Sequence, residues 1–145
     1  MTNVPEFTAD RDAELRKGLV EAIRRDVPDA EAIYLFGSVA RGHTHADSDV
    51  DVALLLPPGR TLPPGRFLAL MTELEGLAHR TVDLSVLDTQ AQLVHANQVV
   101  TTGVCLFAKR PERVRAFEMQ VLSEYARFRE DRAPVEAAYT LDADG

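Results

Sequence analysis

Two kinds of hydrophobic pattern alternate along this chain of 145 residues. Apolar residues that recur at three- and four-residue steps among charged ones predict amphipathic helices over 9–26 and 67–78. Short apolar runs predict strands at 32–36, 50–56, 82–86 and 104–107. Helix and strand therefore alternate, and we predict an α/β (α+β) fold in which helices pack on a small sheet of three to four strands.

Proline and glycine predict where these elements end. The segment 57–66 repeats Pro-Pro-Gly-Arg at both ends and is expected to be a loop that holds neither a helix nor a strand. A further helix over 91–102 is expected to be capped by Asp88 or Thr89 and to stop at Gly103.

A long final helix is predicted over 111–131, and an acidic tail, 132–145, is expected to follow it. Its apolar residues form a stripe at helical spacing: Val114, Phe117, Val121, Tyr125 and Phe128. Packing within the domain would explain this stripe. Contact with a partner would also explain it, because so small a sheet does not need to cover so long a stripe.

Length and composition favour a single domain over 1–145, with a core at about 13–109. No apolar run is long enough to span a bilayer and the start lacks the layout of a signal peptide, so a cytoplasmic protein without membrane association is expected. The net charge of -7 argues against a large nonspecific nucleic-acid surface. Cys105 lies in an apolar run and is expected to be a buried strand residue.

Two aspartates stand at the start of the predicted strand 50–56. Because strand side chains two residues apart share a face, Asp49 and Asp51 point one way and Val50 points the other. Two carboxylates beside an apolar strand repel each other and resist burial unless a cation neutralises them. Magnesium suits this position, because it prefers one or two carboxylates together with substrate phosphates and water.

A third carboxylate, Asp83, opens the strand 82–86. If this strand lies beside the one that carries Asp49 and Asp51, three carboxylates converge. Two metal ions held there would activate an attacking oxygen and stabilise a leaving pyrophosphate, with the third acid placed to accept a proton. Asp88 suits that role less well, since capping the next helix is the simpler explanation for it.

A glycine–serine turn, Gly37-Ser38, follows the first predicted strand and is separated from the aspartate pair by ten residues. A glycine there lets backbone amides approach a phosphate, and the serine hydroxyl adds one hydrogen bond. Joined to the aspartates at this spacing, the turn predicts a nucleotide-transfer site. Arg41 is either a donor to the triphosphate or a solvated arginine.

The four histidines are given no role at this stage. His43 and His45 lack the further ligands that a zinc site needs and are expected to be solvated loop residues. His79 and His95 fall in predicted helices.

Three motifs resemble the minimal nucleotidyltransferases of the DNA polymerase beta superfamily: GSVARG at 37–42, SDVDV at 48–52 and VDLSVL at 82–87. The helix from Gln92, the strand VCLFAKR and the segment FEMQVLSEYARF look like the antitoxin half of HEPN/MNT toxin–antitoxin pairs, so the resemblance covers roughly 13–131. Many members carry an acidic residue after the Arg-Gly pair, where this chain has His43.

This resemblance implies a polymerase-beta-like fold with a mixed sheet and a long C-terminal helix. It also implies an enzyme that uses ATP and magnesium to attach AMP, in one or several units, to a tyrosine of a HEPN-type RNase toxin, which is thereby silenced. The final helix, 111–131, would be the docking surface for the toxin. The nucleotide-binding residues would be Gly37, Ser38, Arg41 and Ser48, and the catalytic, metal-binding acids would be Asp49, Asp51 and Asp83.

Two alternatives remain at this stage. The protein could block its partner by binding alone, with a site that is unused or only senses nucleotide. It could also modify a small hydroxylated molecule such as an aminoglycoside, which would require an acidic acceptor pocket.

Overall fold

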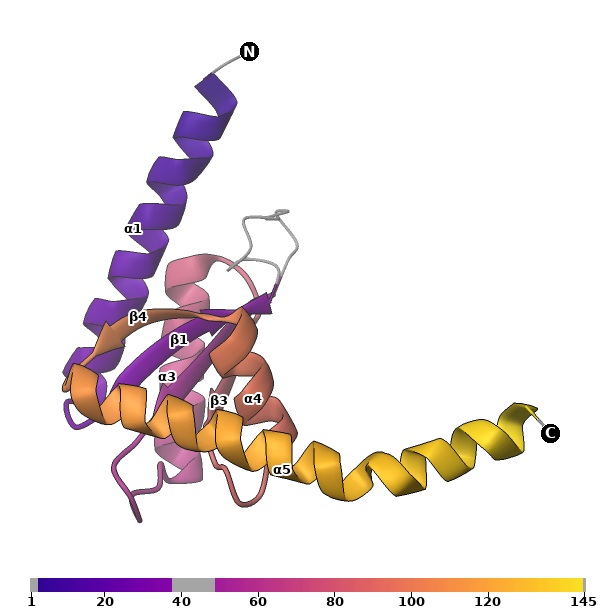
Figure 1. Ribbon diagram of the computed structural model, residues 1–145. Helices are drawn as coiled ribbons and strands as arrows, with labels where there is room; N and C mark the ends of the chain where they lie inside the picture. Colours follow the sequence, from indigo (N-terminus) through magenta and orange to yellow (C-terminus); the bar gives the residue numbers. More distant parts are fainter. Residues whose placement is uncertain (1–2, 38–48, 145) are drawn as a thin grey trace.

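The computed structural model describes residues 3–37 and 49–144, and it describes side chains over 12–37 and 49–132 (Figure 1). In chain order the elements are α1 (Asn3–Asp26), β1 (Ala32–Phe36), β2 (Val50–Leu55), α3 (Pro64–Ala78), β3 (Val82–Val86), α4 (Leu93–Thr102), β4 (Val104–Ala108) and α5 (Pro111–Asp144). Across these described stretches, none of the helices combines the length and the apolar character that crossing a bilayer requires.

The four strands form one mixed sheet in the order β3-β2-β1-β4. β1 runs antiparallel to both of its neighbours, β2 and β4, whereas β2 and β3 are parallel. This arrangement confirms the predicted small mixed sheet, and it leaves β3 and β4 as the edge strands.

The two faces of the sheet bury different sets of side chains, as alternation along each strand requires. One face packs on α1 and α3, through Ile33, Leu35, Val52, Leu54 and Leu84 against Leu19, Ile23, Leu70 and Leu74. The other face packs on α4 and α5, through Tyr34, Phe36 and Ala53 against Ala96, Val99, Val114 and Val121. In Figure 1, α4 and α5 lie in front of the sheet and α3 lies behind it.

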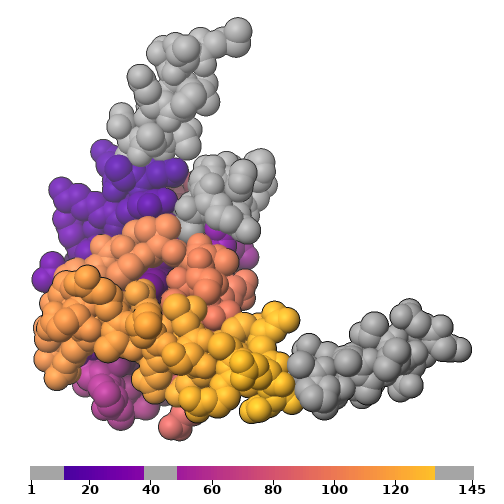
Figure 2. All heavy atoms as spheres, in the orientation of Figure 1, coloured from indigo at the N-terminus to yellow at the C-terminus, as the bar shows by residue number. Residues whose placement is uncertain are grey.

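Polar contacts tie the start of α5 to β1. The Tyr34 hydroxyl, almost fully buried, donates a hydrogen bond to Glu118 Oε2 at 2.7 Å. Glu31, only 4% exposed, forms an ion pair with Arg110, and Arg113 Nη1 lies 3.8 Å from the same carboxylate oxygen. Beyond these contacts α5 continues past the body of the molecule (Figure 1). In the space-filling view its coloured residues, up to 132, form an orange-to-yellow band across the visible face (Figure 2).

Two helices begin earlier than the sequence predicts. α3 begins at Pro64, inside the segment 57–66 that was predicted to be a loop throughout. Proline fits the first turn because its missing N–H has no intrahelical partner there and its φ is already helical. α1 begins at Asn3 rather than near Ala9.

The boundaries of α4 and α5 also differ from the prediction. The N-cap of α4 is Gln92, and Asp88 instead accepts hydrogen bonds from the backbone amides of Gln90 and Ala91, so it holds the preceding turn. α5 continues to Asp144, although it was expected to stop near Asp131. The residues that follow are rich in alanine, which strongly favours a helix.

The prediction that Cys105 is buried is wrong, because its side chain is exposed. The apolar run that contains it forms β4, an edge strand whose first two residues, Val104 and Cys105, are both exposed.

Candidate functional site

The predicted site residues of β1, β2 and β3 lie in one row across the sheet. Phe36, the last residue of β1, pairs with Asp51 of β2, and Asp51 pairs with Asp83 of β3. Residues paired across neighbouring strands share a face, so the Asp51 and Asp83 side chains project from the same side of the sheet. Asp49, two residues before Asp51, belongs to that side by the same alternation.

Gly37 comes directly after this row and approaches Asp51 closely. Its φ is +78°, a conformation that glycine adopts without strain. A Cβ at Gly37 would meet Asp51 Oδ2 well inside 3.0 Å, a separation that real Cβ contacts essentially never reach. The absence of a side chain at Gly37 therefore leaves the space that the Asp51 carboxylate occupies.

The environment of Asp51 disfavours its charged form. Burial raises the pKa of Asp51 most, the negative charge of Asp83 raises it further, and the charge of Asp49 adds to the same effect, whereas His95 lowers it. Asp49 and Asp83 are exposed, so Asp51 is the inner carboxylate of the three. A cation bound between these groups would oppose the shift, because it favours the charged form of Asp51.

These residues fit a hard divalent cation that is completed by its substrate. Within the described parts of the chain, no three His, Cys, Asp or Glu side chains are placed so that they could hold a metal ion by themselves. Magnesium does not require such a set, since one or two carboxylates with phosphate and water oxygens satisfy it. Convergence of Asp49, Asp51 and Asp83 on metal therefore stays a prediction.

His95 lies beside these carboxylates, which the sequence did not reveal. Its Nε2 is 3.1 Å from Ser85 Oγ, and its ring meets Phe36 edge to face, with centroids 5.4 Å apart. Ser85 is two residues after Asp83 on β3 and shares its face. The position of His95 in α4 carries no motif, because only the packing of α4 on the sheet brings it here.

Part of the predicted site lies outside the described residues. Ser38, Arg41 and Ser48, predicted to bind nucleotide, belong to the segment 38–48, as do His43 and His45. Among the described residues, Gly37, Asp49, Asp51 and Asp83 occupy the end of β1 and the starts of β2 and β3.

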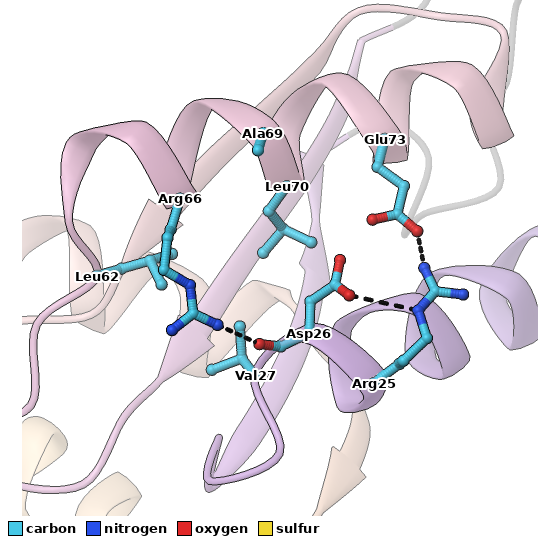
Figure 3. Close-up of a pocket in the computed structure, with 8 residues that line it drawn as sticks. All are labelled: Arg25, Asp26, Val27, Leu62, Arg66, Ala69, Leu70 and Glu73. Atoms are coloured by element: carbon cyan, nitrogen blue, oxygen red, sulfur yellow. Dashed lines mark hydrogen bonds and ion pairs between the residues drawn. The ribbon is translucent and has the colours of Figure 1, made fainter.

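A separate pocket of about 350 Å³ lies between the end of α1 and α3 (Figure 3). Its charged side chains contact each other or the backbone: Arg25 pairs with Asp26 and Glu73, and Arg66 donates to the Asp26 carbonyl at 2.7 Å. The contacts of Arg25 with Glu73 and of Arg66 with the Asp26 carbonyl join α1 to α3.

Comparison with known proteins relates this chain to nucleotidyltransferases. The family model for polymerase beta, nucleotidyltransferase, matches residues 19–112. The protein adenylyltransferase MntA of Shewanella oneidensis is 30% identical over 117 residues, which are 81% of this chain and 81% of that protein.

Solved structures extend this likeness to three dimensions. A chain in the crystal structure of a toxin–antitoxin with AMP-PNP matches with a TM-score of 0.74 and 28% identity, covering 86% of this chain and 98% of its own length. A chain in the structure of the tri-AMPylated Shewanella oneidensis HEPN toxin in complex with MNT antitoxin matches with a TM-score of 0.71 and 25% identity, covering 89% and 98%.

Proposed function

This chain belongs to the polymerase beta nucleotidyltransferase family, whose model matches residues 19–112, and on that premise we propose that it is an antitoxin that transfers AMP from ATP to a tyrosine of a HEPN-type toxin. The single observation that carries the chemistry is the pairing of Asp51 with Asp83 across β2 and β3, with Gly37 in close approach to Asp51. The similarity to MntA and to an MNT antitoxin held with its tri-AMPylated toxin supports the choice of substrate and partner.

The reaction exchanges one phosphorus–oxygen bond for another. The acceptor oxygen attacks the α-phosphorus of ATP, the bond from that phosphorus to the bridging oxygen breaks, and pyrophosphate leaves while AMP stays on the acceptor. Asp83, which is exposed on the edge strand, would take the proton of the acceptor hydroxyl. Gly37 leaves room for the Asp51 carboxylate at the end of β1.

Asp49 and Asp51 would hold magnesium, with Asp83 as the third acid. When bound, magnesium supplies positive charge to the triphosphate and to the attacking oxygen. Ser38, Arg41 and Ser48 complete this proposal as nucleotide-binding residues on the strength of the motif alone.

The partner surface in this proposal is α5. Met119 is 65% exposed and Leu122 is 39% exposed, one turn apart on the same helix, whereas Val114 and Val121 of the helix are buried. Two residues of the predicted stripe thus face the domain core, while Met119 and Leu122, which lie outside the stripe, form an apolar surface that is available to a protein partner.

Labelled ATP tests the activity directly. The purified chain, with magnesium and the product of a neighbouring HEPN-domain gene, should place label on that protein, and changing its acceptor tyrosine to phenylalanine should remove the label. A wild-type chain that folds and binds the toxin yet leaves it unlabelled contradicts the proposed activity.

The double variant Asp49→Asn with Asp51→Asn separates chemistry from binding. Both changes are nearly isosteric, so the fold should persist while transfer falls by at least about 100-fold. Asp29→Asn, near the opposite end of β1, is the matched control and should keep full activity. If cells that carry the double variant remain protected from the toxin, the protein neutralises its partner by contact.

A further inference from the structure

A second pocket of about 550 Å³ adjoins the carboxylate row on the side away from Gly37. Its walls come from β3 and α4. The residues that line it are Asp83, Ser85, Gln92, Val94, His95 and Gln98.

The position of this pocket follows from the order of the strands. Gly37 lies at the end of β1, Asp51 lies on the central strand β2, and Asp83 lies on β3, which is the edge strand. The pocket lies between α4 and the face of β3 that carries Asp83 and Ser85, at the margin of the sheet, where a polypeptide has access.

The carboxylate row has one side for the leaving group and one side for the acceptor of the AMP transfer. The attacking and leaving oxygens must lie roughly in line on opposite sides of the transferred phosphorus. In the proposed function the triphosphate lies at the Gly37 side, so the attacking oxygen must come from the Asp83 side. The pocket is the space on that side.

The lining of the pocket is suited to a hydroxyl-bearing side chain with an apolar body. Val94, which is 55% exposed, gives the pocket an apolar surface. The side-chain amides of Gln92 and Gln98 can form hydrogen bonds with the backbone of the substrate polypeptide on either side of the acceptor residue. The His95 ring is held between Ser85 and Phe36, so this wall is fixed in place. A tyrosine presents such an apolar ring with a polar tip.

We infer that this pocket, between β3 and α4, receives the acceptor tyrosine of the polypeptide substrate and aims its hydroxyl at the α-phosphorus beside Asp83. This inference rests on the proposed function and adds to it the site of acceptor specificity. His95 acts as a positioning residue, because its contacts with Ser85 and Phe36 fix the wall of the pocket that its ring forms. Gln98 and Val94 select the acceptor.

Filling the pocket tests the inference. Gln98→Trp should raise the KM for the toxin about tenfold or more, while the KM for ATP and the affinity for AMP-PNP with magnesium change less than about twofold. Thr101→Trp, exposed on the same helix one turn further on and outside the pocket, should leave all of these constants unchanged within about twofold. An unchanged KM for the toxin in Gln98→Trp, or a parallel loss of AMP-PNP affinity, overturns the inference.

Cross-linking keeps the inference testable even if transfer is never seen. A photoreactive benzoylphenylalanine in place of Val94 should cross-link to the peptide of the toxin that carries the acceptor tyrosine, whereas the same group in place of Thr101 should not. A wild-type chain without transfer contradicts the proposed function. Cross-links from position 94 that miss that peptide, or none at all, contradict the acceptor pocket.

Discussion

The Asp51 carboxylate fills the space where a side chain on Gly37 would have to stand. Gly37→Ala must therefore displace Asp51 or distort the end of β1. We expect AMP transfer to fall by at least about tenfold, since a displaced catalytic group loses its geometry. Steady-state transfer assays and thermal unfolding of the same preparations measure the two effects.

Gly59 provides the control for the backbone contribution. It has the same φ of +78°, but a Cβ there would meet nothing within 4 Å. Gly59→Ala should cost about 1 kcal/mol of unfolding free energy from backbone strain, with transfer unchanged. If both alanine variants lose activity equally, the close approach to Asp51 is not the cause.

Asp51→Asn should stabilise the protein while it removes activity. The pKa of Asp51 is raised by burial and by its neighbouring carboxylates, so the folded state binds a proton more tightly than the unfolded chain does. The stability that this group contributes is present below about pH 4, the ordinary range of an aspartate, and is lost as the pH rises through the raised pKa. At neutral pH the native carboxylate is therefore a net cost that asparagine removes.

In the absence of metal and nucleotide, the Tm of Asp51→Asn at pH 7 should exceed that of the wild type by roughly 2–4 °C. For a chain of this size, that shift corresponds to about 1 kcal/mol of unfolding free energy, a figure that allows for the screening of the Asp51 charge by solvent. The difference should shrink as the pH falls towards 4. Asp12→Asn, on α1, should not change Tm by more than about 1 °C. A lower Tm for Asp51→Asn at pH 7 would contradict the assigned repulsion.

Arg110→Met should destabilise the fold through Glu31. Glu31 is buried, its Oε2 has no hydrogen-bond partner among the described residues, and its Oε1 pairs with Arg110 and more distantly with Arg113. Removing Arg110 leaves a buried charge with one weak partner, at a cost of about 2–3 kcal/mol. Urea unfolding measures this. Arg115→Met, at an exposed position on the same helix, should stay within about 0.5 kcal/mol of the wild type.

Charges placed on the outer surface of α5 should weaken partner binding. Met119→Glu together with Leu122→Glu should raise the Kd for the toxin at least about tenfold, because a carboxylate would be buried in an apolar interface. The unfolding free energy should hardly change, since both side chains are exposed. Leu68→Glu, 58% exposed on α3, is the control. Equal binding by the double variant and this control would place the interface elsewhere.

Much of the sheet could be predicted because its signals are local. β1 and β3 have the predicted bounds, since each is a short apolar run between turn residues. The alternation that directs Asp49 and Asp51 to one face is a property of any strand, whereas the pairing of Asp51 with Asp83, which the sequence left as a condition, is shown by the structure.

The features that were missed depend on packing between distant segments. Cys105 has the neighbours of a buried residue in sequence, but its strand pairs on one side only. His95 becomes a neighbour of Ser85 and Phe36 only when α4 covers the sheet. No pattern along the chain carries either fact.

The alternation of β2 also protects the fold against mispairing. A slip of one residue would turn every β2 side chain to the opposite face, sending Asp49 and Asp51 into the apolar layer under α1 and α3 and moving Val50 and Val52 to the other face. Burying two carboxylates there is prohibitive. The residues that would bind magnesium therefore also specify the register of the central strand, so that folding in the wrong register is penalised by the same charges that catalysis requires.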